Sequence, residues 1–363
     1  MSNLKINKSP LESVKEILKT LLQQDKISGV FSLRKVNEKN SVDYGLITDI
    51  EKLDNIDSFY PVMPVNAGQL LSRFTPLSKP IAAVVRPCEY RAFVEMAKRE
   101  QGQIDNFLFI TYSCSGVYPL KDNQQGKAAE RLTDYRNATE NASIPENVRP
   151  ICTACEHIQP AEADIYISLV GEDQDKTNIF LNTEKAAEML NEIAGEKSDA
   201  VFEAEIHKNL LSERKAAKEK LFKEIDSSET GLDGLVEIFG KCVGCHGCNT
   251  VCPICYCNLC DFDSHNYDYN TPILENELIQ KGALRLPPDT IFFHLGRLSH
   301  MSFSCVGCGM CSDVCPASIP VASVFKKTGE ETAALFDFVA GRSMKEEIPV
   351  MIFKEEEFPE LGV

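Results

Sequence analysis

Hydrophobic and polar residues follow two different periods in the first half of the chain. Residues 11–22 repeat apolar positions every three or four residues, which predicts a helix with one buried face. Short apolar runs follow and predict strands; they cover residues 30–33, 44–48, 80–85, 106–112, 164–170 and 178–181. The run at 80–85 is continuously apolar, as is typical of a strand buried on both faces.

Helical patterns alternate with several of these strands. Residues 90–100 follow the strand at 80–85, and residues 184–193 follow the strand at 178–181. This order, with buried strands, predicts a parallel sheet in an α/β domain over residues 1–205. Residues 117–150 are polar throughout, and we expect them to form a loop.

The pattern changes after residue 205. Residues 206–230 are highly charged with a helical period, which predicts a connecting helix. Residues 231–345 form a cysteine-rich domain whose last part, residues 321–339, is helical in pattern. The acidic tail at 346–363 is expected to be a solvated surface.

Length and charge limit the function classes. The chain has 363 residues, 43% of them hydrophobic, which is enough for two domains with their own cores. Its net charge of −16 would repel a nucleic acid backbone, so we exclude nucleic-acid binding. The sequence has neither the apolar run of a membrane span nor a secretory signal, and we expect a cytoplasmic protein without a direct membrane span.

Cysteines provide the clearest chemical signal. Eleven of the fifteen lie between Cys242 and Cys315, and both the odd count and a reducing cytosol disfavour disulfides. The spacing C-x2-C-x2-C-x3-C, followed by proline, occurs twice; its cysteines are Cys242, Cys245, Cys248 and Cys252, then Cys305, Cys308, Cys311 and Cys315.

This spacing is typical of two-cluster ferredoxins, in which the fourth cysteine of each run ligates the other cluster. We therefore predict two [4Fe–4S] clusters with crossed ligand sets. The sets are Cys242, Cys245, Cys248 and Cys315 for one cluster, and Cys305, Cys308, Cys311 and Cys252 for the other. Zinc, which usually takes two C-x2-C pairs, fits this pattern poorly. Fifty-two residues separate the two motifs, which indicates a mainly α-helical dicluster ferredoxin domain.

Cys255, Cys257 and Cys260 follow the first motif and have no assigned role. They could replace a ligand in the crossed scheme, join a further metal or remain unligated. With His246 or His265 they could also form a zinc site. His294 and His300 flank the second motif, and we expect them to pack near the clusters without ligating them.

Four more cysteines precede the ferredoxin region. Cys88 and Cys114 each directly follow a predicted strand, where α/β sheets place their functional sites. Cys152 and Cys155 form a C-x2-C pair. Spacing alone leaves two interpretations open: a complete ligand set, or two core thiols and a separate redox pair.

The segments around these cysteines resemble a known family. Arg-Pro-Cys88-Glu, Thr-Tyr-Ser-Cys114-Ser-Gly and Cys152-Thr-Ala-Cys155 are similar to the beta subunit of coenzyme F420-reducing hydrogenase and formate dehydrogenase. The segment from Cys315 to Ser343 is similar to helical ferredoxin modules of heterodisulfide-reductase-type complexes. In better-known members the ferredoxin part precedes the α/β part, whereas here it follows.

The resemblance implies that Cys88, Cys114, Cys152 and Cys155 hold a third [4Fe–4S] cluster beside a bound FAD. The strand-to-helix turn after Val85 gathers free N–H groups, so Arg86 and Glu89 are candidate flavin contacts. Alternatively, Arg86 pairs with Glu89. The sequence lacks a Gly-x-Gly-x-x-Gly fingerprint, which leaves a Rossmann-type NAD site without support.

Together these features predict an electron-transfer subunit of an anaerobic cytosolic oxidoreductase complex. Its expected partners are catalytic and electron-transfer subunits, such as those of a formate dehydrogenase, a hydrogenase or a heterodisulfide-reductase-like module. Two alternatives remain open: a flavin-free wiring module, and a stand-alone reductase of a deazaflavin or nicotinamide.

Overall fold

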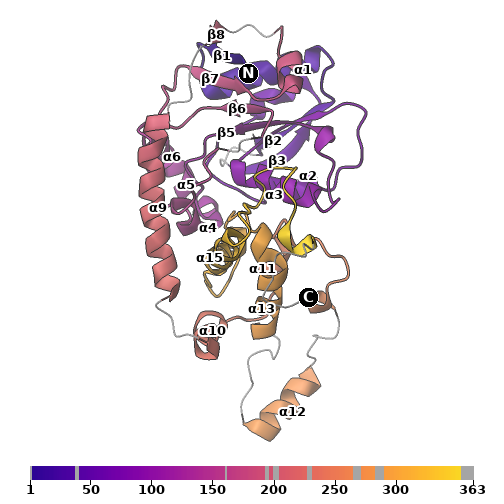
Figure 1. Cartoon of the computed structure of the whole chain (residues 1–363), viewed down its shortest axis with the longest axis vertical. Helices are drawn as coiled ribbons and strands as arrows, with labels where there is room; N and C mark the ends of the chain where they lie inside the picture. Colours follow the sequence, from indigo (N-terminus) through magenta and orange to yellow (C-terminus); the bar gives the residue numbers. More distant parts are fainter. Residues whose placement is uncertain are drawn as a thin grey trace.

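One mixed β-sheet organises the N-terminal half of the computed structural model (Figure 1). The structure describes residues 2–36, 41–159, 162–192, 196–198, 204–226, 231–264, 271–282 and 290–352. The sheet order is β3-β2-β4-β5-β6-β7-β1-β8. The strands are β1 (Ser2–Ile6), β2 (Gly29–Lys35), β3 (Val42–Ile47), β4 (Ile81–Val85), β5 (Phe107–Tyr112), β6 (Ile165–Ile167), β7 (Thr177–Leu181) and β8 (Glu196–Ser198).

The sheet is mixed, whereas the sequence predicted parallel strands. Strands β2, β4, β5 and β6 pair in parallel, while every other neighbouring pair is antiparallel. The N-terminal strand β1 inserts between β7 and β8, a pairing that depends on partners more than 170 residues away. Local sequence does not encode such a partner, although each central strand lies close to its predicted position.

Helices cover both faces of this sheet, which confirms the α/β class. Alternate residues of β4 point to opposite faces because side chains alternate along a strand. Ala82 and Val84 pack in one core with helix α1 (Pro10–Gln23). Ile81, Ala83 and Val85 pack in a second core with α2 (Ala67–Leu71) and α3 (Pro87–Ala97). The N-terminal end of α3 therefore lies at the carboxyl end of β4.

Residues 117–150 are not the polar loop that their composition predicts. They contain three short helices, α4 (Leu120–Gln124), α5 (Lys127–Glu130) and α6 (Leu132–Glu140). Each exposes most of its polar residues, while Ala128, Leu132 and Tyr135 pack against the second core. Too few apolar positions lie in each helix to produce a detectable period.

The C-terminal half is helical, which confirms the second part of the fold prediction. Its helices are α10 (Gly231–Phe239), α11 (Gly247–Thr250), α12 (Thr271–Lys281), α13 (Thr290–Met301), α14 (Met310–Asp313) and α15 (Val321–Ala334). Helix α9 (Ala204–Asp226) runs along one side of the molecule between the two halves (Figure 1). Short helices α7 (Pro150–Thr153) and α8 (Glu184–Met189) complete the sheet domain. Most of the predicted acidic tail, from residue 353 onward, lies outside the described residues.

Buried polar contacts join the two halves. Arg149 forms an ion pair with Asp313 at 2.6 Å, and both side chains are buried. Glu95 on α3 accepts hydrogen bonds from the Ser304 hydroxyl at 2.5 Å and the Gly341 amide at 2.8 Å. These contacts fix the helical domain against the carboxyl ends of β4 and β5. Within the described residues, no helix is long and apolar enough to cross a membrane.

Candidate metal centres

The two cysteine motifs adopt the same local backbone. Gly244 and Gly307 occupy the left-handed region, with φ of 65° and 69°. Two residues later, His246 and Gly309 do so as well, with φ of 52° and 84°. Each motif then enters a single helical turn, α11 or α14. The sequence repeat is therefore also a structural repeat.

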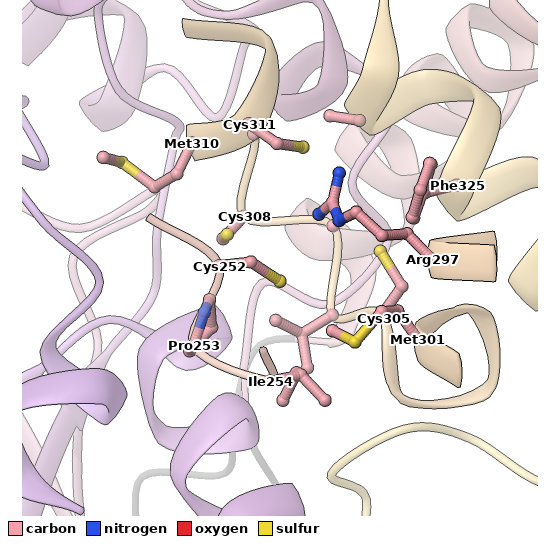
Figure 2. A pocket seen from close by; sticks show the side chains of 14 residues that line it. Cys252, Pro253, Ile254, Arg297, Met301, Cys305, Cys308, Met310, Cys311 and Phe325 are labelled. Carbon is pink, nitrogen blue, oxygen red and sulfur yellow. The ribbon is translucent and has the colours of Figure 1, made fainter. Parts of the chain in front are cut away.

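The structure crosses the motifs as their spacing predicts. We call cavity A the space lined by Cys242, Cys245, Cys248 and Cys315. We call cavity B the space lined by Cys252, Cys305, Cys308 and Cys311. Figure 2 shows these last four cysteines around cavity B, with the Arg297 side chain beside them. In both cavities, the fourth cysteine of one motif joins the first three cysteines of the other.

The four N-terminal cysteines also meet. Because β4 and β5 are parallel neighbours paired at Val85 and Thr111, the residues that follow them lie at the same edge of the sheet. Cys88 and Cys114 therefore come together, and Cys152 and Cys155 approach from α7 and the turn after it. We call the space lined by these four cysteines cavity C.

The donor sets of the three cavities suit iron–sulfur clusters. Each cavity is lined by cysteines that come from separate segments of the chain. Among the described residues, no three His, Cys, Asp or Glu side chains converge on a single-ion site. A cubane separates its four thiolates around a larger group, so this arrangement fits a cluster better than zinc.

Burial raises the pKa values of most of these thiols. The pKa of Cys152 and that of Cys248 rise to about 11, and the pKa of Cys308 rises to about 12. The pKa of Cys88 lies well above its ordinary value, because burial and the nearby Glu89 carboxylate both disfavour the thiolate. Such thiols are too weakly acidic to be free thiolates at neutral pH, whereas coordination to iron displaces the proton.

The cavities lie in series. Gly307 and Cys308 line both cavity B and cavity C. The Arg149 side chain contacts this shared wall, because it donates to the Cys308 carbonyl at 3.0 Å. Arg297 lines cavity B and donates to Cys248 Sγ of cavity A at 3.1 Å. Cavity B is thus the middle member of a row that crosses the domain boundary.

Sequence reasoning missed the buried arginines around the cavities. Arg214 on α9 donates to the carbonyls of Cys155 and Cys114, at 2.9 and 3.0 Å. Burial opposes the charge of Arg297, but the surrounding cysteines leave its pKa above the ordinary value. Both arginines lie far in sequence from the cysteines that they contact, so no local motif reveals them.

Arg86 is occupied by protein groups. Its guanidinium lies 3.5 Å from the Glu89 carboxylate and donates to the carbonyls of Tyr60 and Val62. Tyr44 hydrogen-bonds both partners, and all of these groups are buried. The structure therefore contains the ion pair that was the alternative to a flavin contact. Arg86 also lines cavity C.

The other cysteines and histidines that the sequence singled out differ in their surroundings. Cys255 contacts Met301 Sδ at 3.5 Å beside cavity B, whereas Cys257 is exposed. His246 lies 3.1 Å from Asp263 and stacks on Phe293, and His265 lies outside the described residues.

His294 lines cavity A, and both of its ring nitrogens are buried without a hydrogen-bond partner in the described residues. Burial lowers the pKa of His294 to about 4, so its ring is neutral at pH 7. His300, near the exposed end of α13, lines none of the three cavities.

A larger cleft opens beside cavity C. Tyr112 and Ser113, directly before Cys114, line it together with Tyr60, Tyr135 and Arg136, and its volume is about 400 Å³. We call it the tyrosine cleft. The Tyr60 hydroxyl is buried without a hydrogen-bond partner in the described residues. The cleft therefore offers aromatic surface and an unused polar group at the carboxyl end of β5.

Comparison with known proteins agrees with this architecture. Residues 78–209 match the model for the C terminus of the coenzyme F420 hydrogenase/dehydrogenase beta subunit, and residues 237–319 match the 4Fe-4S dicluster domain. The dicluster match and the cysteine sites thus define an iron–sulfur protein. Over residues 78–209 the chain is therefore similar to coenzyme F420 hydrogenase/dehydrogenase beta subunits.

Two relatives align over most of their length. The F420-dependent formate dehydrogenase subunit beta of Methanocaldococcus jannaschii is 25% identical, over 87% of each chain. The F420-dependent formate dehydrogenase 1 subunit beta of Methanococcus maripaludis is 29% identical, over 88% of each chain. A chain of the F420-reducing [NiFe] hydrogenase complex from Methanosarcina barkeri aligns with a TM-score of 0.47 and 13% identity, covering 62% of this chain and 93% of that one.

Proposed function

We propose that this protein is the electron-transfer beta subunit of an F420-dependent formate dehydrogenase complex in the cytosol. The observation that carries the proposal is the row of three cavities, each lined by at least four cysteines. A row of buried redox centres provides a path through an otherwise insulating protein. The two formate dehydrogenase relatives, which align along nearly the whole chain, support the choice of complex.

Each cavity holds one [4Fe–4S] cluster in this proposal. Cluster A takes Cys242, Cys245, Cys248 and Cys315; cluster B takes Cys252, Cys305, Cys308 and Cys311; cluster C takes Cys88, Cys114, Cys152 and Cys155. The chain's own contribution is to bury the clusters, hold them in order and tune their potentials through charge and hydrogen bonds. Cluster A faces the partner subunit because Cys245 is exposed, and cluster C lies at the substrate end.

FAD is proposed to occupy the tyrosine cleft. The cleft is large, lined by Tyr60, Tyr112 and Tyr135, and begins one residue from Cys114. The unpaired Tyr60 hydroxyl and the Arg136 side chain supply polar contacts for an amphipathic cofactor. A bound flavin exchanges single electrons with clusters and electron pairs with a hydride carrier such as coenzyme F420. This location replaces Arg86, whose N–H groups are used within the protein.

Iron content tests the cluster assignment. Protein purified without oxygen should contain about twelve iron atoms per chain, four for each cubane. A Cys88→Ser, Cys114→Ser double variant should lose about four and retain the rest. Retention of all the iron in that variant would exclude cluster C.

Flavin extraction tests the substrate end. The proposal expects about one FAD per chain, and Tyr60→Phe combined with Arg136→Met should weaken its retention at unchanged iron content. Full iron with no flavin would favour a wiring module that relays single electrons. Turnover of reduced coenzyme F420 by the isolated chain, with an artificial acceptor, would favour a stand-alone reductase.

A further inference from the structure

Arg297 lies between cavities A and B. It comes from α13, is only 3% exposed and lines cavity B (Figure 2). One terminal nitrogen donates to Cys248 Sγ and the other to the Cys248 carbonyl, both at 3.1 Å. The rings of Phe293 and Phe325 lie 5.5 and 4.9 Å from the guanidinium carbon. These contacts hold the guanidinium in one place between two sets of cysteines.

No carboxylate neutralises Arg297 among the described residues. Two other buried arginines near the boundary of B and C have such a partner: Arg149 pairs with Asp313, and Arg86 pairs with Glu89. Arg214 beside cavity C resembles Arg297, because it donates to backbone carbonyls and has no carboxylate partner in the described residues. The Nε atom of Arg297 has no hydrogen-bond partner in the described residues either. A guanidinium remains charged at every accessible pH, and burying it without an anion is costly. The position therefore requires a negative group in the adjoining cavities.

A [4Fe–4S] cluster with four thiolates supplies that negative charge. It is a dianion when oxidised and gains one further negative charge on reduction. A nearby fixed cation and an N–H donated to a ligating sulfur both stabilise the more negative, reduced form. Arg297 provides the cation to both clusters, but it provides the hydrogen bond only to a ligand of cluster A.

We propose that Arg297 is the shared counter-charge of clusters A and B, and that it makes both easier to reduce, with the larger effect on cluster A. The inference rests on the proposed function because it assumes that both clusters are present. Arg297 acts through the cysteines and their cluster, so it is a positioning residue rather than a catalytic one. Its positive charge also reduces the electrostatic repulsion that an electron meets at the two anionic clusters.

Redox titration of the intact chain, followed by electron paramagnetic resonance, tests this role. Arg297→Met removes the charge and keeps an unbranched apolar stem, whereas Arg297→Lys retains the charge without the two-nitrogen fork. Lys327→Met is the matched control, because Lys327 is paired with Asp226 and Glu331 on the surface of α15. The signal of cluster A is the one that Cys245→Ser abolishes.

We expect Arg297→Met to weaken reduction of cluster A at least tenfold, which is about 59 mV for a one-electron step. Cluster B should shift in the same direction by less. Arg297→Lys should recover at least half of the shift, and Lys327→Met should leave both potentials unchanged. Unchanged potentials in Arg297→Met, or a lysine variant that behaves like the methionine variant, would overturn the proposal.

Iron analysis separates the possible failures. If the wild-type chain lacks the iron of clusters A and B, the proposed function itself fails. If Arg297→Met loses cluster A, then Arg297→Gln, which keeps an N–H donor, replaces it in the titration. A glutamine variant that holds eight irons in A and B at wild-type potentials would contradict the role of the charge.

Discussion

At the scale of single residues, Cys252 and Cys255 form a hydrogen-bonded pair beside cavity B. The neighbouring Cys255 side chain lowers the pKa of Cys252. Cys252 lines cavity B, whereas Cys255 does not. The arrangement favours Cys252 as the ligand and Cys255 as the donor of a hydrogen bond to its sulfur, an assignment that spacing alone left open.

Alanine substitutions distinguish these two cysteines. Cys252→Ala should lose about four irons, because cluster B lacks a ligand. Cys255→Ala should retain all of its iron and shift only the potential of cluster B, since it removes a hydrogen bond to the ligating sulfur. Cys257→Ala, at an exposed position, is the control that should change neither. Iron loss from Cys255→Ala with retention in Cys252→Ala would reverse the assignment.

The predictability of the site differs between residue types. The cysteines of A and B repeat at short intervals, so a local pattern predicted how they cross. Arg297 lies 49 residues from Cys248, and one arginine in a helix is ordinary. Its contact exists only because α13 packs over the first motif. Such a residue becomes visible only when the tertiary structure brings a buried charge to the cavity.

At the scale of elements, the loop between Cys308 and α14 packs tightly against the sheet domain. Gly309 has a φ of 84°, and a Cβ there would lie 2.8 Å from Ile151 Cγ2 and 3.1 Å from Arg149 Cδ. Both the conformation and the contact require glycine. The equivalent position in the first motif is His246, so the close approach to α7 belongs only to the second loop.

Two glycine substitutions separate conformation from contact. Gly126 has a φ of 77° with nothing within 4 Å of a Cβ, so Gly126→Ala carries only the conformational cost of about 1 kcal/mol. Gly309→Ala adds a clash in a packed core, which costs a further ~1–3 kcal/mol. Thermal unfolding should therefore rank Gly309→Ala below Gly126→Ala. Equal melting temperatures would mean that the loop yields without strain.

Glu95 connects α3 to the helical domain. Burial would raise its pKa, but Lys98, Ser304 and the Gly341 amide outweigh this effect and lower it. A lowered pKa means that its contribution to stability is present above the ordinary carboxyl value of about 4.5 and is lost as the pH falls through the lower folded value.

Glu95→Gln should therefore destabilise the protein at pH 7 by about 3 kcal/mol, because it leaves buried Lys98 and Arg99 without their anion. The difference from wild type should shrink as the pH falls below about 4.5, because the unfolded wild-type chain then binds a proton that the folded carboxylate does not. It should vanish once the folded carboxylate is protonated as well. Denaturant unfolding at several pH values measures both effects. Glu331→Gln, at an exposed pair on α15, is the control and should have little effect at any pH.

Elements with a strong hydrophobic period were predicted better than elements with a weak hydrophobic period. The apolar face of α1 and the buried run of β4 placed those elements within one or two residues. Helices α4–α6 were missed because α4 buries no side chain and α5 and α6 bury only one each. Strand β1 was missed because its pairing with β7 and β8 is a long-range property.

At the scale of the whole molecule, the domain boundary passes between cavities B and C. The sheet domain contributes the cysteines of C, while the helical domain contributes those of A and B. The Arg149–Asp313 ion pair and the shared wall at Gly307 and Cys308 keep the two domains in contact at that place. Electrons that pass between A and C must therefore cross the boundary through B.

Removing the middle cluster should interrupt this path without disabling either end. Cys311 lines cavity B and neither of the other two, so Cys311→Ala removes cluster B most selectively. In the complex with its catalytic partner, formate should still reduce cluster A, but reduction of cluster C should slow at least a hundredfold. Rapid-freeze paramagnetic resonance follows each cluster after formate is added, and dithionite serves as the control that reduces both directly. Reduction of cluster C by formate at the wild-type rate would show that electrons enter the sheet domain by another route, and cavity B would then be a branch rather than the link.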